Sequence, residues 1–331
     1  MNKTANMKGR LTHGGNLDNA VRQYGIPRDQ WLDLSTGINP LPYPIGNPNE
    51  KSWSNLPDSN AEAALLSAAG AYYGVPGSAC IVASPGTQAL IQWLPRLIPK
   101  SSVAILGPTY AEHAHCWRTA GHKVDSLSIT GQLPENADVI VAVNPNNPDG
   151  YIHSPTDLTR LAKPDRLVIV DEAFADTQPS CSVIPATGRP GLLVLRSFGK
   201  FFGLAGMRLG FVITHADMAH KLRNALGPWA VTGPTLEIGA KAFADVNWIA
   251  KTRLRLREDA ARLDSLVKPR LGIAVGGTDL FRLYKIDDTN LYSKLASEGI
   301  LTRTFPKKPN MLRLGLPPND NGFKRLAEAL F

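Results

Sequence analysis

Short apolar segments recur along the first two thirds of the chain, and helix-like segments separate them. The apolar runs are residues 80–83, 103–106, 139–143, 167–170, 192–195 and 209–213. Continuous apolar runs, rather than alternating ones, are typical of strands that are covered on both faces. Helical patterns occupy residues 87–97, 111–120 and 156–162. This succession predicts an α/β domain with a mainly parallel sheet and helices on both sides.

The pattern changes after residue 225. A long helical stretch at 236–266 precedes shorter strand-like and helical pieces, which predict a smaller α+β domain. These pieces are strands near 272–275, 280–284 and 310–314, and helices near 290–298 and from residue 321. The first 45 residues are rich in Gly, Pro and Asn, so we expect an extended arm that packs with the small domain or the cleft. A chain of 331 residues exceeds one compact core, and we predict an arm (1–45), a large domain (46–225) and a small domain (226–331).

Composition limits the possible partners and compartments. Lys and Arg exceed Asp and Glu by 36 to 28, a balance that favours anionic partners. The densest basic stretch, 251–270, alternates with Leu and acidic residues, so it indicates a solvated helix face and no nucleic-acid partner. Three widely spaced cysteines form neither a disulfide framework nor a zinc site. With no apolar run long enough for a signal peptide or a membrane span, we expect a cytoplasmic protein.

Several common motifs are absent. The chain has no dinucleotide-binding Gly-x-Gly-x-x-Gly, phosphate-binding loop, Gly-x-Ser-x-Gly or His-Glu-x-x-His. The cluster His113, His115 and Cys116 resembles a metal site, but on a helix the two histidines point to different faces. We therefore assign this cluster to a packed or surface helix and predict no metal.

Polar residues follow three of the predicted strands, at the edge where open parallel sheets bind ligands. The first strand runs into an Asn-Pro-Asn-Asn-Pro turn at 144–148, and the second ends in Asp171 and Glu172. The third is followed by Ser197, Lys200 and Arg208. Taken singly, each feature is more typical of a turn, a solvated cap or a surface loop than of a binding site. Together they supply the amide, carboxylate, amine and phosphate clamp that a pyridoxal phosphate site needs.

These motifs resemble the fold-type I pyridoxal-phosphate enzymes of the histidinol-phosphate aminotransferase branch. The matching elements are Asn-Pro-Asn-Asn-Pro-x-Gly, Asp-Glu-Ala, and Ser-x-x-Lys with an Arg eight residues after the Lys, and the resemblance extends over nearly the whole chain. It implies the fold-type I transferase fold, an α/β fold with a mainly parallel sheet in a large cofactor-binding domain plus a smaller α+β domain. It also implies pyridoxal 5'-phosphate as the cofactor and a homodimer.

The resemblance assigns the residues around the cofactor ring. Lys200 is expected to bind the cofactor through its amine and to move protons afterwards, because an amine desolvated near cations can lose its proton. Asp171 is expected to pair with the pyridine nitrogen and keep the ring an electron acceptor. Asn147 should donate to the phenolic oxygen of the ring, and Tyr110 should stack on its face.

The same resemblance assigns the cofactor phosphate. Ser197 and Arg208 should hold it, while Gly86, Thr87 and Gln88 offer donors at the start of a helix, where a dianion is favoured.

Two N-terminal segments look like those of the threonine-phosphate decarboxylases of cobalamin biosynthesis. They are residues 13–16, His-Gly-Gly-Asn, and residues 33–40, Asp-Leu-Ser-Thr-Gly-Ile-Asn-Pro. This likeness implies decarboxylation of L-threonine O-3-phosphate to (R)-1-amino-2-propanol O-2-phosphate, so the partner is a small phosphorylated amino acid. Arg313 matches the substrate-anion arginine of the family and Arg303 is a second candidate cation, with His13, Asn39 and Asn147 as further substrate contacts. His13 is also compatible with a solvated arm position.

Two departures from the aminotransferase pattern leave alternatives open. Phe174 stands where aminotransferases carry a tyrosine that bonds the phenolic oxygen, and Leu56 stands where relatives place a tyrosine that reaches the partner's cofactor. Both argue against aminotransferase activity without excluding it, and Phe174 together with residues 13–16 favours the decarboxylase. Histidinol-phosphate aminotransferase remains an alternative, because it shares nearly every named site residue. A non-catalytic basic binding module on the same fold is the remaining alternative, because fold does not determine function.

Overall fold

The structure, a computed structural model, describes residues 14–331 and places a seven-stranded sheet in the large domain. The strand order is β2-β8-β7-β6-β5-β3-β4, and β8 is the antiparallel member. The strands are β2 (Cys80–Ser84), β3 (Ser102–Gly107), β4 (Lys123–Ser128), β5 (Val139–Val143), β6 (Leu167–Asp171), β7 (Leu192–Ser197) and β8 (Gly210–Thr214). The predicted strands and the mainly parallel sheet are thus confirmed. The edge strand β4 was not predicted, because its residues are largely exposed and lack an apolar run.

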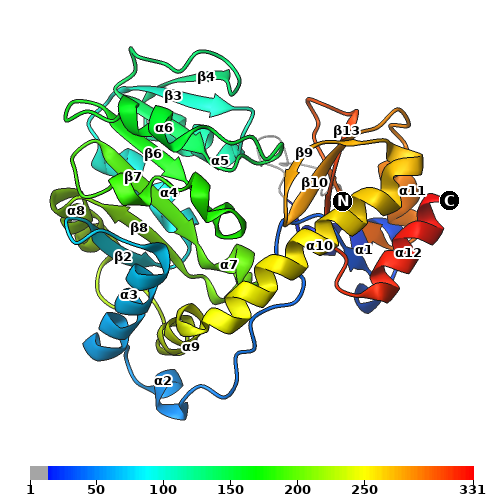
Figure 1. The fold of residues 1–331 in the computed structure, drawn as a ribbon, viewed down its shortest axis with the longest axis horizontal. Helices are drawn as coiled ribbons and strands as arrows, with labels where there is room; N and C mark the ends of the chain where they lie inside the picture. Colours follow the sequence, from blue (N-terminus) through cyan, green and yellow to red (C-terminus); the bar gives the residue numbers. More distant parts are fainter. Residues whose placement is uncertain (1–13) are drawn as a thin grey trace, which may run out of the picture.

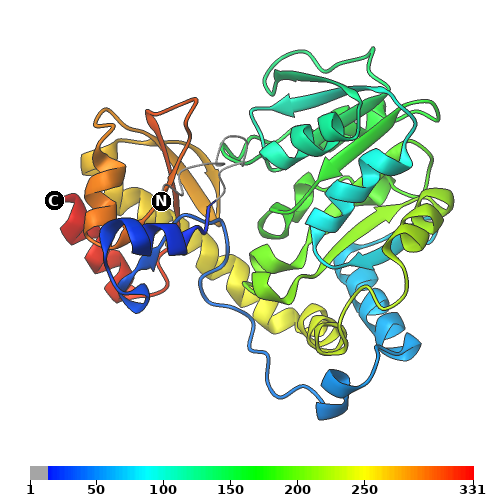
Figure 2. The ribbon, with the colours of Figure 1, turned by 180° about the vertical axis from the view of Figure 1, so that it is seen from behind.

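Helices cover both faces of this sheet (Figures 1 and 2). Those of the large domain are α2 (Glu50–Ser54), α3 (Ser59–Tyr73), α4 (Thr87–Leu97), α5 (Ala111–Thr119), α6 (Pro155–Leu161), α7 (Phe198–Phe201), α8 (Ala216–Leu226) and α9 (Gly233–Ala244). Because successive strand side chains face opposite sides, Ile169 and Leu193 pack with Leu90 of α4 and Trp117 of α5, whereas Val170 joins the cluster on the other face.

The small domain has a four-stranded antiparallel sheet in the order β12-β13-β10-β9. Its elements are β9 (Ala274–Thr278), β10 (Phe281–Lys285), α11 (Leu291–Ser297), β11 (Ile300–Leu301), β12 (Arg303–Thr304), β13 (Met311–Gly315) and α12 (Asp320–Leu330). These mixed short elements confirm the predicted α+β character. No helix in the described part of the chain combines the length and apolar character that a membrane span requires.

The predicted single helix at 236–266 is two helices, α9 and the 26-residue α10 (Val246–Leu271). The break falls at Asp245, whose carboxylate accepts the backbone N–H of Trp248 and caps α10, a preference that the apolar periodicity does not reveal. Phe243 of α9 packs against Tyr73 and Phe211 of the large domain. Helix α9 therefore packs with the large domain although it follows residue 225, and α10 leads from there to the small domain (Figure 1).

The N-terminal segment is more folded than an extended arm. Residues Leu17–Tyr24 form α1, and β1 (Leu32–Asp33) pairs in parallel with β11. Trp31 and Leu34 are buried, so this segment contributes to the core of the small domain. The sequence analysis did not predict α1, because its helical pattern is only about two turns long and lies within a Gly- and Pro-rich segment.

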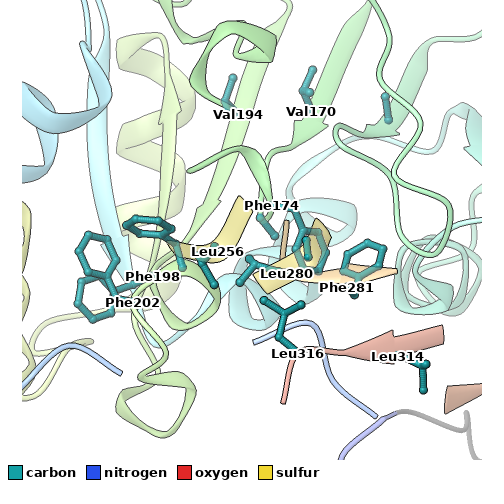
Figure 3. Packing of buried hydrophobic residues seen from close by; sticks show 14 of the residues in the cluster. Val170, Phe174, Val194, Phe198, Phe202, Leu256, Leu280, Phe281, Leu314 and Leu316 are labelled. Atoms are coloured by element: carbon teal, nitrogen blue, oxygen red, sulfur yellow. The ribbon is translucent and has the colours of Figure 1, made fainter. Parts of the chain in front are cut away.

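The apolar core continues from one domain into the other. Phe174, just after β6, meets Phe281 of β10 with ring centroids 5.0 Å apart, and Leu314 of β13 belongs to the same cluster. Figure 3 shows Val170 and Val194 of the sheet on one side of this contact and the small-domain leucines on the other. This packing fixes the carboxyl ends of β5, β6 and β7 opposite the small-domain sheet.

Candidate active site

A cavity of about 1270 Å³ lies at the carboxyl ends of the central strands, between the two domains. The sequence-predicted residues that line it are Gly86, Thr87, Gln88, Tyr110, Asn147, Asp171, Ser197, Lys200, Arg208, Arg303 and Arg313. They come from six separate regions of the chain, and the fold brings them together. Of the other two predicted residues, His13 lies outside the described residues.

Asn39 does not line this cavity. Its side chain is buried and bonded elsewhere: Nδ2 donates to the carbonyl of Phe201, and Oδ1 accepts from Leu41 N and from Arg255 at 2.6 Å. Its backbone N–H also donates to the carbonyl of Lys200 at 2.9 Å. The prediction that Asn39 contacts substrate therefore needs correction, because its polar atoms tie residues 39–41 to the segment that carries Lys200.

Lys200 lies in the short helix α7, directly after β7. Gly199 allows this helix to pack closely against the backbone at Ala205, since a Cβ on residue 199 would lie 2.6 Å from the Cα of Ala205. Burial, helped by the nearby cations Arg313 and Arg208 and opposed by Asp171, lowers the pKa of the Lys200 amine to about 8. A substantial fraction of the amine is therefore neutral near physiological pH, as a nucleophile requires.

Asp171, the last residue of β6, has a partner that the sequence analysis did not identify. Nε2 of His113 lies 2.9 Å from Asp171 Oδ2, and both side chains are buried. The other carboxylate oxygen accepts the backbone N–H of Ala173. Two partners thus fix the orientation of this carboxylate. The spacing of three residues between Tyr110 and His113 is compatible with neighbouring side chains, but nothing local in the sequence indicates the pairing with Asp171.

A phosphate-sized group would meet donors at the start of α4. Gly86 is the N-cap residue, with φ of 82° and ψ of 158°, and no side chain caps the helix at this position. A Cβ on Gly86 would lie 2.5 Å from a guanidinium nitrogen of Arg208, so glycine leaves room for that side chain. The free N–H groups of a helix start, together with Ser197 and Arg208, suit a dianion.

Arg313 of β13 is held at the opposite side of the cavity. Its guanidinium donates to Asn147 Oδ1 at 2.5 Å and to the carbonyl of Ser35 at 2.9 Å. Burial lowers its pKa to about 9, and the charge of Arg303 contributes. Since Asn147 Oδ1 accepts from Arg313, the amide NH₂ is the group available as a donor to a ligand.

More cationic side chains line the same side than the sequence analysis identified. The loop between β12 and β13 contributes Lys307 and Lys308, both exposed, in addition to Arg303. The guanidinium of Arg303 lies 5.5 Å from the ring centroid of Phe305. The signal in the sequence was the Lys-Lys pair between two prolines, five residues before Arg313. The small-domain side of the cavity is therefore strongly positive and suited to an anionic substrate.

The two residues that depart from the aminotransferase pattern have different surroundings. Phe174 is buried, packs on Phe281, and its ring lies 5.6 Å from Lys200 Nζ. It therefore supplies an apolar wall and no hydroxyl. Leu56 is 66% exposed and lies outside the cavity.

The donor set fits pyridoxal phosphate. A glycine cradle and an arginine suit the phosphate, an oriented carboxylate suits the ring nitrogen, and an amine with a lowered pKa suits the aldehyde. Tyr110, at the start of α5, donates its hydroxyl to Gln88 at 3.2 Å. The ring of Tyr110 also lies edge-on to His113, with centroids 6.1 Å apart, so it lies between Gln88 and the histidine that contacts Asp171.

Comparisons with known proteins agree with this geometry. The model of the family "Aminotransferase class I and II" matches residues 48–330. The chain is 42% identical to the threonine-phosphate decarboxylase of Pseudomonas aeruginosa over 97% of both chains. It is 30% identical to a histidinol-phosphate aminotransferase of Shewanella oneidensis, over 89% of this chain and 80% of that one. The crystal structure of the histidinol-phosphate aminotransferase from Clostridium acetobutylicum superposes with a TM-score of 0.78 at 22% identity, covering 90% of this chain and 97% of that chain.

Proposed function

Because the chain belongs to the class I and II aminotransferase family, we propose that it is a pyridoxal-phosphate-dependent decarboxylase. Its substrate is L-threonine O-3-phosphate, and its products are carbon dioxide and (R)-1-amino-2-propanol O-2-phosphate, a precursor in cobalamin biosynthesis. The identity of 42% to a threonine-phosphate decarboxylase, against 30% to an aminotransferase, supports this choice. The observation that carries it is the row of small-domain cations facing Lys200 across the cavity.

Residues of the large domain would hold the cofactor on one side of the cavity, and residues of the small domain would bind the substrate on the other. When bound, pyridoxal phosphate supplies an electron-accepting ring that stabilises the electron pair left at the substrate's α carbon. Asp171, oriented by His113, would stabilise the protonated ring nitrogen. Lys200, whose pKa is lowered to about 8 mainly by burial, is available first as a nucleophile and then as a proton donor to the α carbon.

The substrate carries two anionic groups, and the cavity offers cations for both. Arg313 is buried and held by Asn147 and Ser35, whereas Arg303 is half-buried and lies on the strand that leads into the loop with the exposed Lys307 and Lys308. We assign the phosphate of the substrate to the small-domain side of the cavity, where these cations lie. Binding energy at the remote phosphate would then fix the orientation of the substrate, so that the bond from its α carbon to the carboxylate is the one placed to break.

Phe174 is consistent with this reaction. An apolar side chain close to Lys200 excludes water from the reacting carbon and provides no further hydrogen bond to the ring. The homodimer and the cytoplasmic location predicted from the sequence are also part of this proposal.

The decisive experiment is a paired assay of the cofactor-loaded protein. One sample receives O-phospho-L-threonine, and the other receives histidinol phosphate with 2-oxoglutarate. We expect carbon dioxide and aminopropanol phosphate from the first without any keto acid. Glutamate formed in the second sample, with no carbon dioxide in the first, would instead identify an aminotransferase.

A further inference from the structure

A buried cluster of charged side chains lies beneath the candidate active site. Arg196 of β7 forms ion pairs with Glu172 at 2.9 Å and with Asp176 at 2.8 Å. All three side chains are at most 4% exposed. The guanidinium of Arg196 also lies 4.4 Å from the ring centroid of Tyr73. None of these three charged residues lines the cavity.

The cluster is directly joined to two predicted cofactor ligands. Glu172 follows Asp171, and Arg196 precedes Ser197. Side chains alternate across a strand, so Arg196 shares a face with Val194, whereas Ser197 shares one with Leu195. Strands β6 and β7 are neighbours, and the backbone N–H of Glu172 donates to the carbonyl of Leu195. The ion pair therefore joins the two strand ends on the face opposite the ligands.

Further hydrogen bonds fix the cluster to the surrounding elements. The Glu172 carboxylate accepts from the Ser182 hydroxyl and from Val183 N, both at 2.6 Å. Asp176 accepts from the Tyr72 hydroxyl of α3 at 2.9 Å. Arg253 of α10 donates both to the carbonyl of Asp176 and to the hydroxyl of Tyr72. The strand ends are thus tied to a helix of the large domain and to the helix that leads into the small domain.

Stability alone is a weak reason for such a cluster. Burying three charges has a large desolvation cost, and apolar replacements of buried ion pairs are often equally stable. Burial in fact raises the pKa of Glu172, even though Arg196 and the two donors to its carboxylate lower it. A geometric role explains the cluster better, because paired and hydrogen-bonded charges permit only a narrow range of positions.

We propose that Arg196, Glu172 and Asp176 are positioning residues that hold Asp171 and Ser197 at the spacing the cofactor requires. The inference rests on the proposed cofactor and adds residues that touch neither cofactor nor substrate. Its consequence is that the cluster determines the affinity for pyridoxal phosphate, separately from any effect on folding.

The test is a neutral version of the cluster, Arg196→Met with Glu172→Gln and Asp176→Asn. It nearly retains side-chain volume and leaves an amide oxygen to accept from Val183 N and another to accept from the Tyr72 hydroxyl, but it removes the ion pairs. The matched control is Arg282→Met with Asp264→Asn, which removes the Arg–Asp pair bonded to Tyr284 in the small domain. The readouts are the dissociation constant of pyridoxal phosphate by absorbance titration, the pH dependence of the bound cofactor's spectrum, and thermal unfolding of the cofactor-free protein.

We expect the neutral cluster to weaken cofactor binding at least tenfold and to shift the pH dependence of its spectrum, while the control binds like wild type. Binding within twofold of wild type would overturn the proposal, whatever happens to the unfolding temperature. If the triple variant does not fold, Glu172→Gln alone should weaken the binding of pyridoxal phosphate at least threefold. Binding by this single variant within twofold of wild type would overturn the proposal. Wild-type protein that does not bind pyridoxal phosphate would overturn both this inference and the proposed function, whereas wild type that binds it but releases no carbon dioxide would refute only the function.

Discussion

Gly86→Ala should weaken cofactor binding through the position of Arg208. The new Cβ would lie 2.5 Å from a guanidinium nitrogen and 3.0 Å from Cζ of Arg208, so the side chain must move. The conformation of Gly86, with φ of 82° and ψ of 158°, belongs to a region used almost only by glycine. The substitution therefore has two separable effects, backbone strain and displacement of a phosphate ligand.

The sizes of these effects follow from the geometry. Backbone strain of this kind costs about 1–3 kcal/mol of folding stability. Loss of a hydrogen bond to a charged group costs about 1.5–3 kcal/mol. At about 1.4 kcal/mol per tenfold change, the second term weakens pyridoxal phosphate binding about 10- to 100-fold.

Gly74→Ala is the matched control. Gly74 likewise has a positive φ, 65°, at the end of α3, but a Cβ there would meet nothing within 4 Å. We would measure the dissociation constant of the cofactor by absorbance titration and the stability of both cofactor-free variants by urea unfolding. Both should lose stability, and only Gly86→Ala should lose cofactor affinity. Equal cofactor affinities in the two variants would refute the assigned role of Arg208.

Three further predictions follow from the same site. The rate at which cofactor-free protein binds pyridoxal phosphate should rise as the pH increases through about 8, where the buried Lys200 amine loses its proton. Lys200→Ala should abolish both this binding reaction and activity. A rise only near the ordinary pKa of lysine would contradict the argument that burial lowers the pKa of Lys200. Replacing Lys307 and Lys308 together by alanine should raise KM for O-phospho-L-threonine severalfold and leave kcat unchanged, with a smaller effect at high salt, because both line the cavity mouth. Lys324→Ala on α12 is the control, and an equal change in KM there would indicate a general charge effect. Gly150→Ala should lower the stability of the protein in thermal unfolding. The loss should exceed the backbone strain of about 1–3 kcal/mol expected at its φ of +70°, because the new Cβ would also lie 1.9 Å from a backbone oxygen of β9. An unchanged unfolding temperature would disprove this close contact between the domains.

The contrast between predicted and missed site residues has a physical basis. Lys200, Asp171 and Ser197 could be placed at the sheet edge because each lies within five residues of an apolar run that is visible in the sequence. His113 could not, since its partnership with Asp171 joins residues 58 positions apart. Asn39 was assigned to the substrate by resemblance, but its side chain is occupied by Arg255, which lies 216 positions away. Such pairings depend on how the elements pack, and no local pattern encodes them.

The sequence by itself determined the succession of strands and helices, the mainly parallel sheet and the identity of the groups at its carboxyl edge. These follow from local periodicity and from the rule that parallel strands end at one edge. The tertiary structure decided that α9 packs with the large domain, that α1 and β1 join the small domain, and that the loop lysines face the cavity. It also placed Arg196, Glu172 and Asp176 behind the ligands they adjoin. These features arise from contacts between distant residues, whose energy is defined only once the chain is packed.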